Sequence, residues 1–202
     1  MFMQVIKGKV GDAGKARDAL DRWLAELSEG AAGWLGSTSG VTADHVFISL
    51  ARFDSEEDAR RNSDRPEQGA WWADTERLFT GPVSFSDSAD VDVVLVDDPG
   101  RAGFVQVMEG KVSDPDRVRE LMHIDPDTWL ATRPELLGTV TAVYGDGGYT
   151  TAAYFTSEAA AREGEEKELP AEMQAMMQEL SQLFIGDTTY YDLKQPWLDR
   201  PK

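Results

Sequence analysis

The stretch FMQVIKGKV at residues 2–10 returns as FVQVMEGKV at residues 104–112, an offset of 102 positions. The same offset relates further pairs of residues, among them Gly36 and Gly138, Phe53 and Phe155, and Ser55-Glu56 and Ser157-Glu158. Further along the chain the offset increases by three, so that Leu78-Phe79 aligns with Leu183-Phe184. A repeat of this length indicates a duplicated domain rather than a short solenoid unit.

The repeat predicts two domains of ordinary size joined by a short linker. We expect a first domain at residues 1–96, a linker at 97–103 and a second domain at 104–202. The chain has 202 residues, of which 41% are hydrophobic. Each copy is therefore large enough to bury a core of its own.

Composition excludes several classes of function. The chain has no cysteine, which excludes disulfides, thiol nucleophiles and thiolate metal sites. Its formal net charge of −17 disfavours binding to nucleic acid and to anionic membranes, because both attract clusters of lysine and arginine. No apolar stretch is long enough to span a membrane, and no signal peptide is visible. We expect a cytoplasmic protein with neither nucleic acid nor membrane as a partner.

Each copy has the pattern of strand, helix, strand, strand, helix and strand. Residues 2–10 alternate as a half-buried strand does. Asp12 and Asp114 are typical helix N-caps, and apolar residues recur at helical spacing after Asp12. In the second copy an insertion with a proline, at residues 123–126, predicts that this helix is kinked or split. Asp146-Gly147 predicts the tight turn of a hairpin.

The second helix of the first copy opens with NSDRPEQGAWW at residues 62–72. Asp64 is expected to cap this helix, with Pro66 in its first turn and Glu67 closing a capping box. This stretch, the opening strand and the order of elements resemble the antibiotic biosynthesis monooxygenase (ABM) family. The resemblance covers nearly the whole chain as two tandem copies, although the stretch ELPAEMQAMM at residues 168–177 matches the family motif less closely.

The resemblance implies an α+β fold built from two ferredoxin-like βαββαβ domains. Members of the family usually pair two identical subunits through their antiparallel sheets to form a dimeric α+β barrel. Here one chain would supply both halves as an intramolecular barrel. We therefore expect a monomer that is a pseudo-dimer, or a weak homodimer.

The family includes oxygenases of aromatic polyketides that need no cofactor, and heme-degrading enzymes. In the heme-degrading relatives the proximal ligand is a histidine on the second helix. This chain has Trp71-Trp72 on that helix in the first copy and Met176-Met177 in the second, while its two histidines, His45 and His123, lie elsewhere. No spacing typical of a metal, dinucleotide or phosphate site is present. We expect no cofactor and no metal, and heme degradation is not expected.

Oxygenation without a cofactor needs an apolar cavity for a flat substrate and polar groups that take its proton. Candidate substrate-binding residues in the first copy are Trp34, Phe47, Gln68, Trp71 and Trp72. Candidate catalytic residues are Asn62, His45 and Arg52. The resemblance makes Asn62 and the helix tryptophans the leading members of this set.

The repeat also supports a competing interpretation. Trp71-Trp72 correspond to apolar Met176-Met177, so packing of a helix on a sheet is sufficient to explain them. Gln4 and Gln106 are shared within apolar strands, where they are expected to bridge strands or the two halves. Two functions stay open: oxygenation or binding of an aromatic or apolar small molecule in the first copy, or a non-enzymatic ligand-binding or structural role. A cavity too small for a ring would argue against oxygenation.

Overall fold

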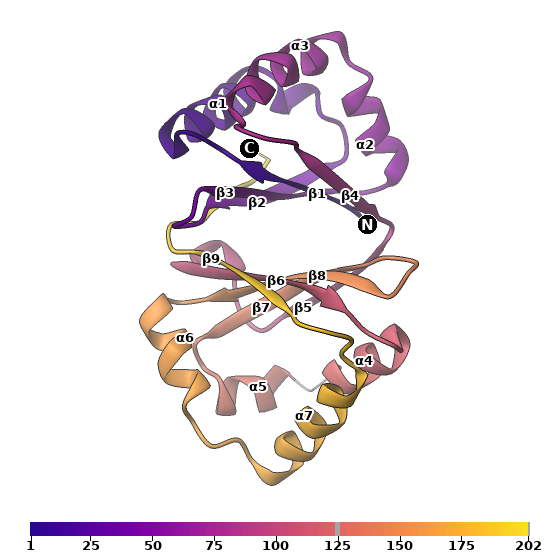
Figure 1. Ribbon diagram of the computed structural model, residues 1–202, viewed down its shortest axis with the longest axis vertical. Helices are drawn as coiled ribbons and strands as arrows, with labels where there is room; N and C mark the ends of the chain where they lie inside the picture. Colours follow the sequence, from indigo (N-terminus) through magenta and orange to yellow (C-terminus); the bar gives the residue numbers. More distant parts are fainter. Residues whose placement is uncertain (124–125, 202) are drawn as a thin grey trace. The chain divides into compact units, whose positions relative to one another are not determined.

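The computed structural model describes residues 1–123 and 126–201. The chain forms two compact units (Figure 1). Unit 1 comprises Met1–Val91 and Pro196–Lys202, and unit 2 comprises Asp92–Gln195. No helix within the described ranges is long and apolar enough to cross a bilayer.

Unit 1 is a five-stranded antiparallel sheet in the order β10-β2-β3-β1-β4, with helices on one face (Figure 1). Its strands are β1 (Phe2–Lys9), β2 (Trp34–Val41), β3 (Val46–Phe53), β4 (Ser84–Ser88) and β10 (Trp197–Asp199). Its helices are α1 (Ala13–Glu26), α2 (Glu56–Ser63) and α3 (Pro66–Thr75), with short 3-10 turns at Ser28–Gly30 and Glu76–Leu78.

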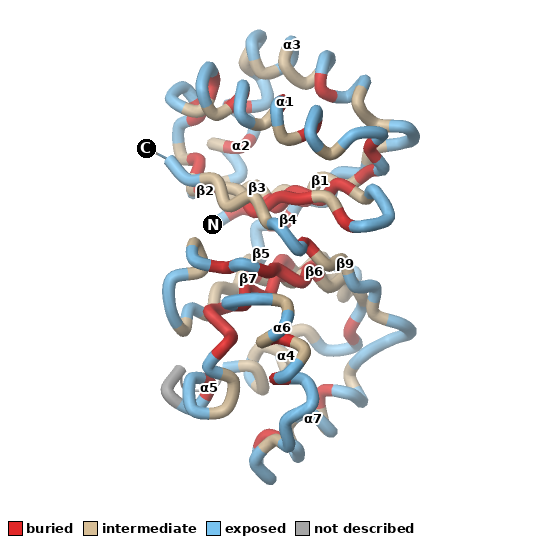
Figure 2. The backbone as a smooth tube through the Cα atoms, turned by 90° about the vertical axis from the view of Figure 1, so that its left-hand side faces the viewer, coloured by how far each residue is buried: buried red, intermediate tan, exposed pale blue. Residues whose placement is uncertain are grey.

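Unit 2 repeats this plan in a sheet ordered β5-β7-β8-β6-β9. Its strands are β5 (Asp90–Leu95), β6 (Phe104–Lys111), β7 (Leu136–Val143), β8 (Gly148–Phe155) and β9 (Thr189–Leu193). Its helices are α4 (Pro115–Met122), α5 (Pro126–Thr132), α6 (Glu158–Glu165) and α7 (Ala171–Leu183), with a 3-10 turn at Pro99–Arg101. In both units the central strands carry most buried residues, and the outer turns of the helices are exposed (Figure 2).

The strand register confirms the duplication. The β1–β3 pairing starts at Phe2↔Phe53, and the β6–β8 pairing starts at the equivalent Phe104↔Phe155. Asp12 and Asp114 cap α1 and α4 as expected, since each carboxylate accepts a hydrogen bond from a backbone N–H of the first turn. The α+β, ferredoxin-like fold of two tandem copies is thus confirmed. The pairing of the two sheets into one barrel stays a prediction.

The start of α3 differs from the expectation. Its N-cap is Arg65, not Asp64, and no side chain caps it. The reason is Pro66, which disfavours helical geometry in the residue before it and holds Arg65 extended, with φ −68° and ψ 130°. Glu67 accepts a hydrogen bond from the Arg65 side chain (2.9 Å), so the expected capping box does not form.

The helix of the second copy that was expected to be kinked or split is two separate helices, α4 and α5. Ile124 and Asp125, within the insertion, lie outside the described residues. In the hairpin of this copy, Gly147 takes the positive φ (82°) expected of the Asp146-Gly147 turn. The equivalent position in the first copy is His45, with φ 66°.

The terminal strands cross the expected boundaries of 1–96 and 104–202. The strand β5 follows β4 after a single residue, Ala89, yet it joins the sheet of unit 2. The last strand, β10, lies against β2 in unit 1 (Figure 2). Each copy therefore contributes its final strand to the other copy's sheet. A division of the chain into two continuous segments cannot describe such an exchange.

Candidate functional site

A small cavity lies inside unit 1, between the sheet and the helices. Its volume is about 30 Å³. Its walls come from β1, β3, α1, α3 and the 3-10 turn after α3, through Ile6, Ala16, Leu20, Phe47, Ser49, Trp71, Trp72, Thr75, Leu78 and Phe79. A volume of this size admits a water molecule, whereas a benzene-binding cavity is about 150 Å³. In this conformation the cavity does not admit an aromatic ring, which counts against oxygenation in the closed state.

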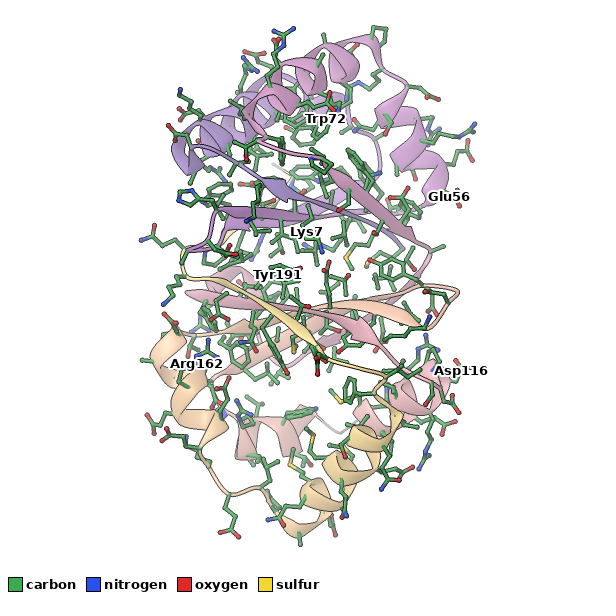
Figure 3. All side chains as sticks on the ribbon, in the orientation of Figure 1. Lys7, Glu56, Trp72, Asp116, Arg162 and Tyr191 are labelled. Atoms are coloured by element: carbon green, nitrogen blue, oxygen red, sulfur yellow. The ribbon has the colours of Figure 1, made fainter. Side chains whose placement is uncertain are left out.

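The outer wall of the cavity is a cluster of aromatic rings. Trp72 lies beneath α3 on the side of the sheet (Figure 3). Its ring centroid is 6.1 Å from that of Phe79 and 5.2 Å from that of Phe85, with the last pair edge to face. Phe85 lies on the edge strand β4 and is 48% exposed. Behind Trp72 the cluster therefore ends at a ring that is open to solvent.

The cavity has no side chain suited to act as a general acid or base. Its two polar side chains are Ser49 and Thr75, and both are already bonded. The Ser49 hydroxyl shares a hydrogen bond with Ser39 (2.7 Å), and Thr75 donates to the carbonyl of Trp71 (2.8 Å). No acid, base or cation stands among the lining residues. The arrangement suits retention of an apolar molecule, and it offers no group that would deprotonate one.

Three of the five candidate substrate-binding residues lie in the cavity wall, namely Phe47, Trp71 and Trp72. The other two belong to a neighbouring core. Trp34 packs edge to face on Trp23, with centroids 4.9 Å apart. Gln68 accepts a 2.6 Å hydrogen bond from the Trp23 indole. Trp34 and Gln68 thus pack around Trp23, near the C-terminal end of α1.

The structure does not bring the candidate catalytic residues together. Asn62 is buried at the end of α2, where its carbonyl oxygen accepts a 3.0 Å hydrogen bond from Arg65. His45 is exposed in the β2–β3 turn. Arg52 follows Ala51 on β3, and Ala51 packs on the helix side, so Arg52 points to the opposite face of the sheet. None of the three lines the cavity.

Several lining residues were missed as site residues. Ala16 and Leu20 are part of the apolar stripe of α1, which reads only as core in the sequence. Phe79 is apolar in both copies, so the repeat offers no reason to select it. The repeat does distinguish Phe47, because the aligned residue of the second copy is Tyr149, which carries a hydroxyl group.

The equivalent region of unit 2 is built differently. Tyr149 shares a hydrogen bond with Thr188 (3.0 Å). Burial raises the pKa of the Tyr149 phenol, and this hydrogen bond partly offsets the rise. Met177 and Phe184, which align with Trp72 and Phe79, are 45% and 40% exposed. Unit 2 thus keeps the contact between Tyr149 and Phe184, with centroids 5.9 Å apart, but has a methionine in place of Trp72.

The shared glutamines bridge strands as expected. Gln4 on β1 donates a 3.1 Å hydrogen bond to Asp87 on β4. Gln106 on β6 donates a 2.9 Å hydrogen bond to Asp192 on β9. Each edge strand is thus tied to the centre of its sheet by the same polar pair. Within the described residues no group of three histidine, aspartate or glutamate side chains is placed to hold a metal ion.

The last strand of the chain reaches the back of the cavity wall. Trp197 packs on Phe47, with ring centroids 6.3 Å apart. Arg17 on α1 donates to both carboxylate oxygens of Asp199, at 3.1 and 3.0 Å, and also contacts Asp21. Burial lowers the pKa of the Arg17 guanidinium, but its hydrogen bonds to Asp21 and Asp199 outweigh this and raise it.

Comparison with known proteins agrees at the level of the fold. A candidate monooxygenase from Lactobacillus acidophilus superposes with a TM-score of 0.73 at 10% identity, covering 98% of each chain. A candidate monooxygenase from Fusobacterium nucleatum has a TM-score of 0.73 at 10% identity, covering 98% of this chain and 94% of the other. An anthrone oxidase-like protein has a TM-score of 0.66 at 11% identity, covering 100% of this chain and 91% of the other.

No family model and no curated protein matches the sequence. The structural matches extend over both copies, and their identities are low, so they speak for the fold alone. They agree with the architecture that the ABM resemblance implied. The chain therefore has a ferredoxin-like α+β fold in two tandem copies, similar over its whole length to these structures.

Proposed function

We propose that unit 1 binds a small apolar molecule with one or two rings in the cavity beneath α1 and α3. The observation that carries this proposal is the composition of the wall, which is aliphatic and aromatic apart from two hydroxyls that are already bonded. Such a wall favours apolar ligands through burial of their surface. Because the closed volume is only about 30 Å³, binding requires the rings around Trp72 to move outward.

In this proposal the Trp72 side chain is the one that moves when a ligand enters. The indole N–H groups of Trp71 and Trp23 are each held by a hydrogen bond, to the Ala19 carbonyl and to Gln68. In the part of the chain that the structure describes, no hydrogen bond holds the indole of Trp72. Its partner Phe85 is half exposed. Rotation of these two rings opens the cavity without unfolding α3.

The test uses 2-naphthol, a neutral two-ring phenol whose emission comes from its neutral form when neither water nor a base takes its proton. We expect saturable binding by the wild-type protein, with increased neutral-form emission. Ala16→Leu fills the cavity from α1 and is expected to weaken binding at least tenfold. Met177→Ala, at the position in unit 2 that aligns with Trp72, is the matched control and should leave the affinity unchanged.

Two outcomes contradict the proposal. One is the absence of binding by the wild-type protein. The other is equal binding by wild type and Ala16→Leu, which would place the probe elsewhere. A naphtholate emission in the bound state would show that water or a base reaches the hydroxyl, contrary to the apolar lining described above.

Oxygenation of the bound molecule is the second candidate function. It is favoured by the full-length similarity to candidate monooxygenases and to an anthrone oxidase-like protein. An oxygen electrode with 2-naphthol or anthrone separates the two functions. Binding alone predicts no consumption above the background, whereas oxygenation predicts consumption that Ala16→Leu abolishes. In the oxygenase case Asn62, His45 and Arg52 stay the proposed catalytic residues, brought to the ligand only by a rearrangement.

A further inference from the structure

We infer that the C-terminal strand β10 is an autoinhibitory strap, which holds the Phe47 wall of the unit 1 cavity in place and whose release lets the cavity enlarge around a ligand that enters past Trp72. This inference rests on the proposed function and concerns the regulation of the same site. The strand is short. It pairs with β2 only through Trp197↔Ser39, Leu198↔Thr38 and Asp199↔Ser37.

The first contact of the strap acts on the cavity wall through Phe47. This residue is 5% exposed and packs edge to face on Phe79, with centroids 5.6 Å apart. Trp197 contacts the same ring at a centroid distance of 6.3 Å. Phe47 thus contacts both Phe79 and Trp197. It cannot shift toward the strap while Trp197 stays in place.

The second contact ties the strap to the helix that forms the opposite wall. Arg17 lies on α1 next to Ala16 and one turn before Leu20, and both neighbours line the cavity. Its guanidinium makes two parallel hydrogen bonds to Asp199, a geometry that is stronger than a single bond. The guanidinium carbon also lies 5.5 Å from the centre of the Trp197 ring. One arginine therefore fixes both side chains of the strap to α1.

The equivalent segment of unit 2 has no such arrangement. Val94 approaches Gly138 as Asp199 approaches Gly36, so the sequence offset is 105 here and Asp92 takes the position of Trp197. Val94 has no carboxylate and Asp92 has no ring, so neither contact of the strap can form in unit 2. The strap contacts and the cavity thus occur together in unit 1. Two contacts and three strand pairs make an element that can detach while the rest of the sheet stays folded.

The test compares full-length variants. Asp199→Asn keeps the shape of the side chain and removes its charge, which weakens the bond to Arg17. If the closed state dominates, a larger open population raises the apparent affinity in proportion. We expect 2-naphthol to bind about fivefold more tightly than to wild type. Trp197→Ala should act in the same direction, and Asp97→Asn, which weakens an ion pair with Arg101 in unit 2, should have no effect.

Hydrogen exchange provides a second readout that does not depend on a ligand. In Asp199→Asn the amides of β10 and of residues 37–39 should exchange faster, while those of β9 stay as in wild type. Unchanged affinity in Asp199→Asn and Trp197→Ala, with wild-type binding intact, would overturn the strap and leave the proposed function standing. Absence of binding in wild type and in both variants would instead remove the proposed function, and the strap with it.

Discussion

At the residue scale, the cavity of unit 1 depends on a few large side chains whose polar atoms are placed elsewhere. The indole of Trp23 donates to Gln68, that of Trp34 to Ser37, and that of Trp71 to the Ala19 carbonyl. Buried indoles need such acceptors, and these bonds fix the orientation of the rings. Trp71 therefore supplies a rigid wall, while Trp72 is held mainly by its ring contacts with Phe79 and Phe85.

The hydrogen bond of Asn62 gives this residue a structural role that does not involve the cavity. Its side chain accepts a hydrogen bond from Arg65, whose same nitrogen also donates to the carbonyl of Leu27 at 3.1 Å. This network joins the end of α2 to the end of α1. Asn62→Ala should lower the free energy of unfolding by about 1–2 kcal/mol, because it leaves a partly buried donor without its acceptor.

Urea denaturation measures this loss, and 2-naphthol affinity should be unchanged in Asn62→Ala. Ser63→Ala is the control, since Ser63 is exposed and bonds only within its own helix, at Ala59. It should change stability by no more than about 0.5 kcal/mol. A stable Asn62→Ala protein that no longer binds 2-naphthol would return Asn62 to the site.

At the scale of elements, two glycines explain how the fifth strand enters each sheet. Gly36 and Gly138 lie at the irregularity of β2 and β7 and have φ of 126° and 155°. A Cβ on Gly36 would lie 2.7 Å from the carbonyl oxygen of Asp199, and one on Gly138 would lie 2.6 Å from that of Val94. Only glycine allows so close an approach of the incoming strand. The recurrence of these glycines in the repeat thus has a tertiary cause.

Gly36→Ala should destabilise unit 1 by about 1–3 kcal/mol, because the backbone conformation is unfavourable and β10 must move. It should also accelerate hydrogen exchange in β10. Gly69→Ala is the matched substitution in α3, where a Cβ meets nothing within 4 Å. That variant should be more stable than wild type by up to about 1 kcal/mol, since alanine favours the helix. Equal stability of the two variants would show that β10 is not packed against Gly36 in solution.

At the scale of the whole molecule, charge is the dominant property. The chain carries 37 acidic and 20 basic residues, and its formal net charge is −17. Many ion pairs lie on the surface, such as Arg77–Asp74 and Arg101–Asp97, and exposed pairs of this kind contribute little stability. Repulsion among the remaining carboxylates therefore opposes folding at low ionic strength.

Added salt should stabilise the protein. Raising NaCl from about 0.01 M to about 0.15 M shortens the screening length from about 30 Å to about 8 Å and weakens the repulsion. We expect Tm to rise by a few degrees in differential scanning calorimetry, and potassium chloride to have the same effect as sodium chloride. A falling Tm would mean that attractive pairs such as Arg17–Asp199 outweigh the repulsion.

Four features were predictable from the amino-acid sequence: the duplication, the order of strands and helices, the N-caps at Asp12 and Asp114, and the glutamines that bridge strands. These features follow from local periodicity and from recurrence at a constant offset, so they can be read without coordinates. The N-cap of α3 also depends on neighbouring residues in the sequence. It was misassigned because Pro66 acts on Arg65 rather than on Asp64.

Which residues share a cavity, and which strand completes each sheet, became visible only in the folded chain. Asn62, His45 and Arg52 lie on a helix end, a turn and the far face of a strand, and nothing in their spacing reveals this separation. The contact of Trp197 with Phe47 joins residues from opposite ends of the chain. Such contacts depend on how the chain returns upon itself, and local patterns of polarity do not specify that path.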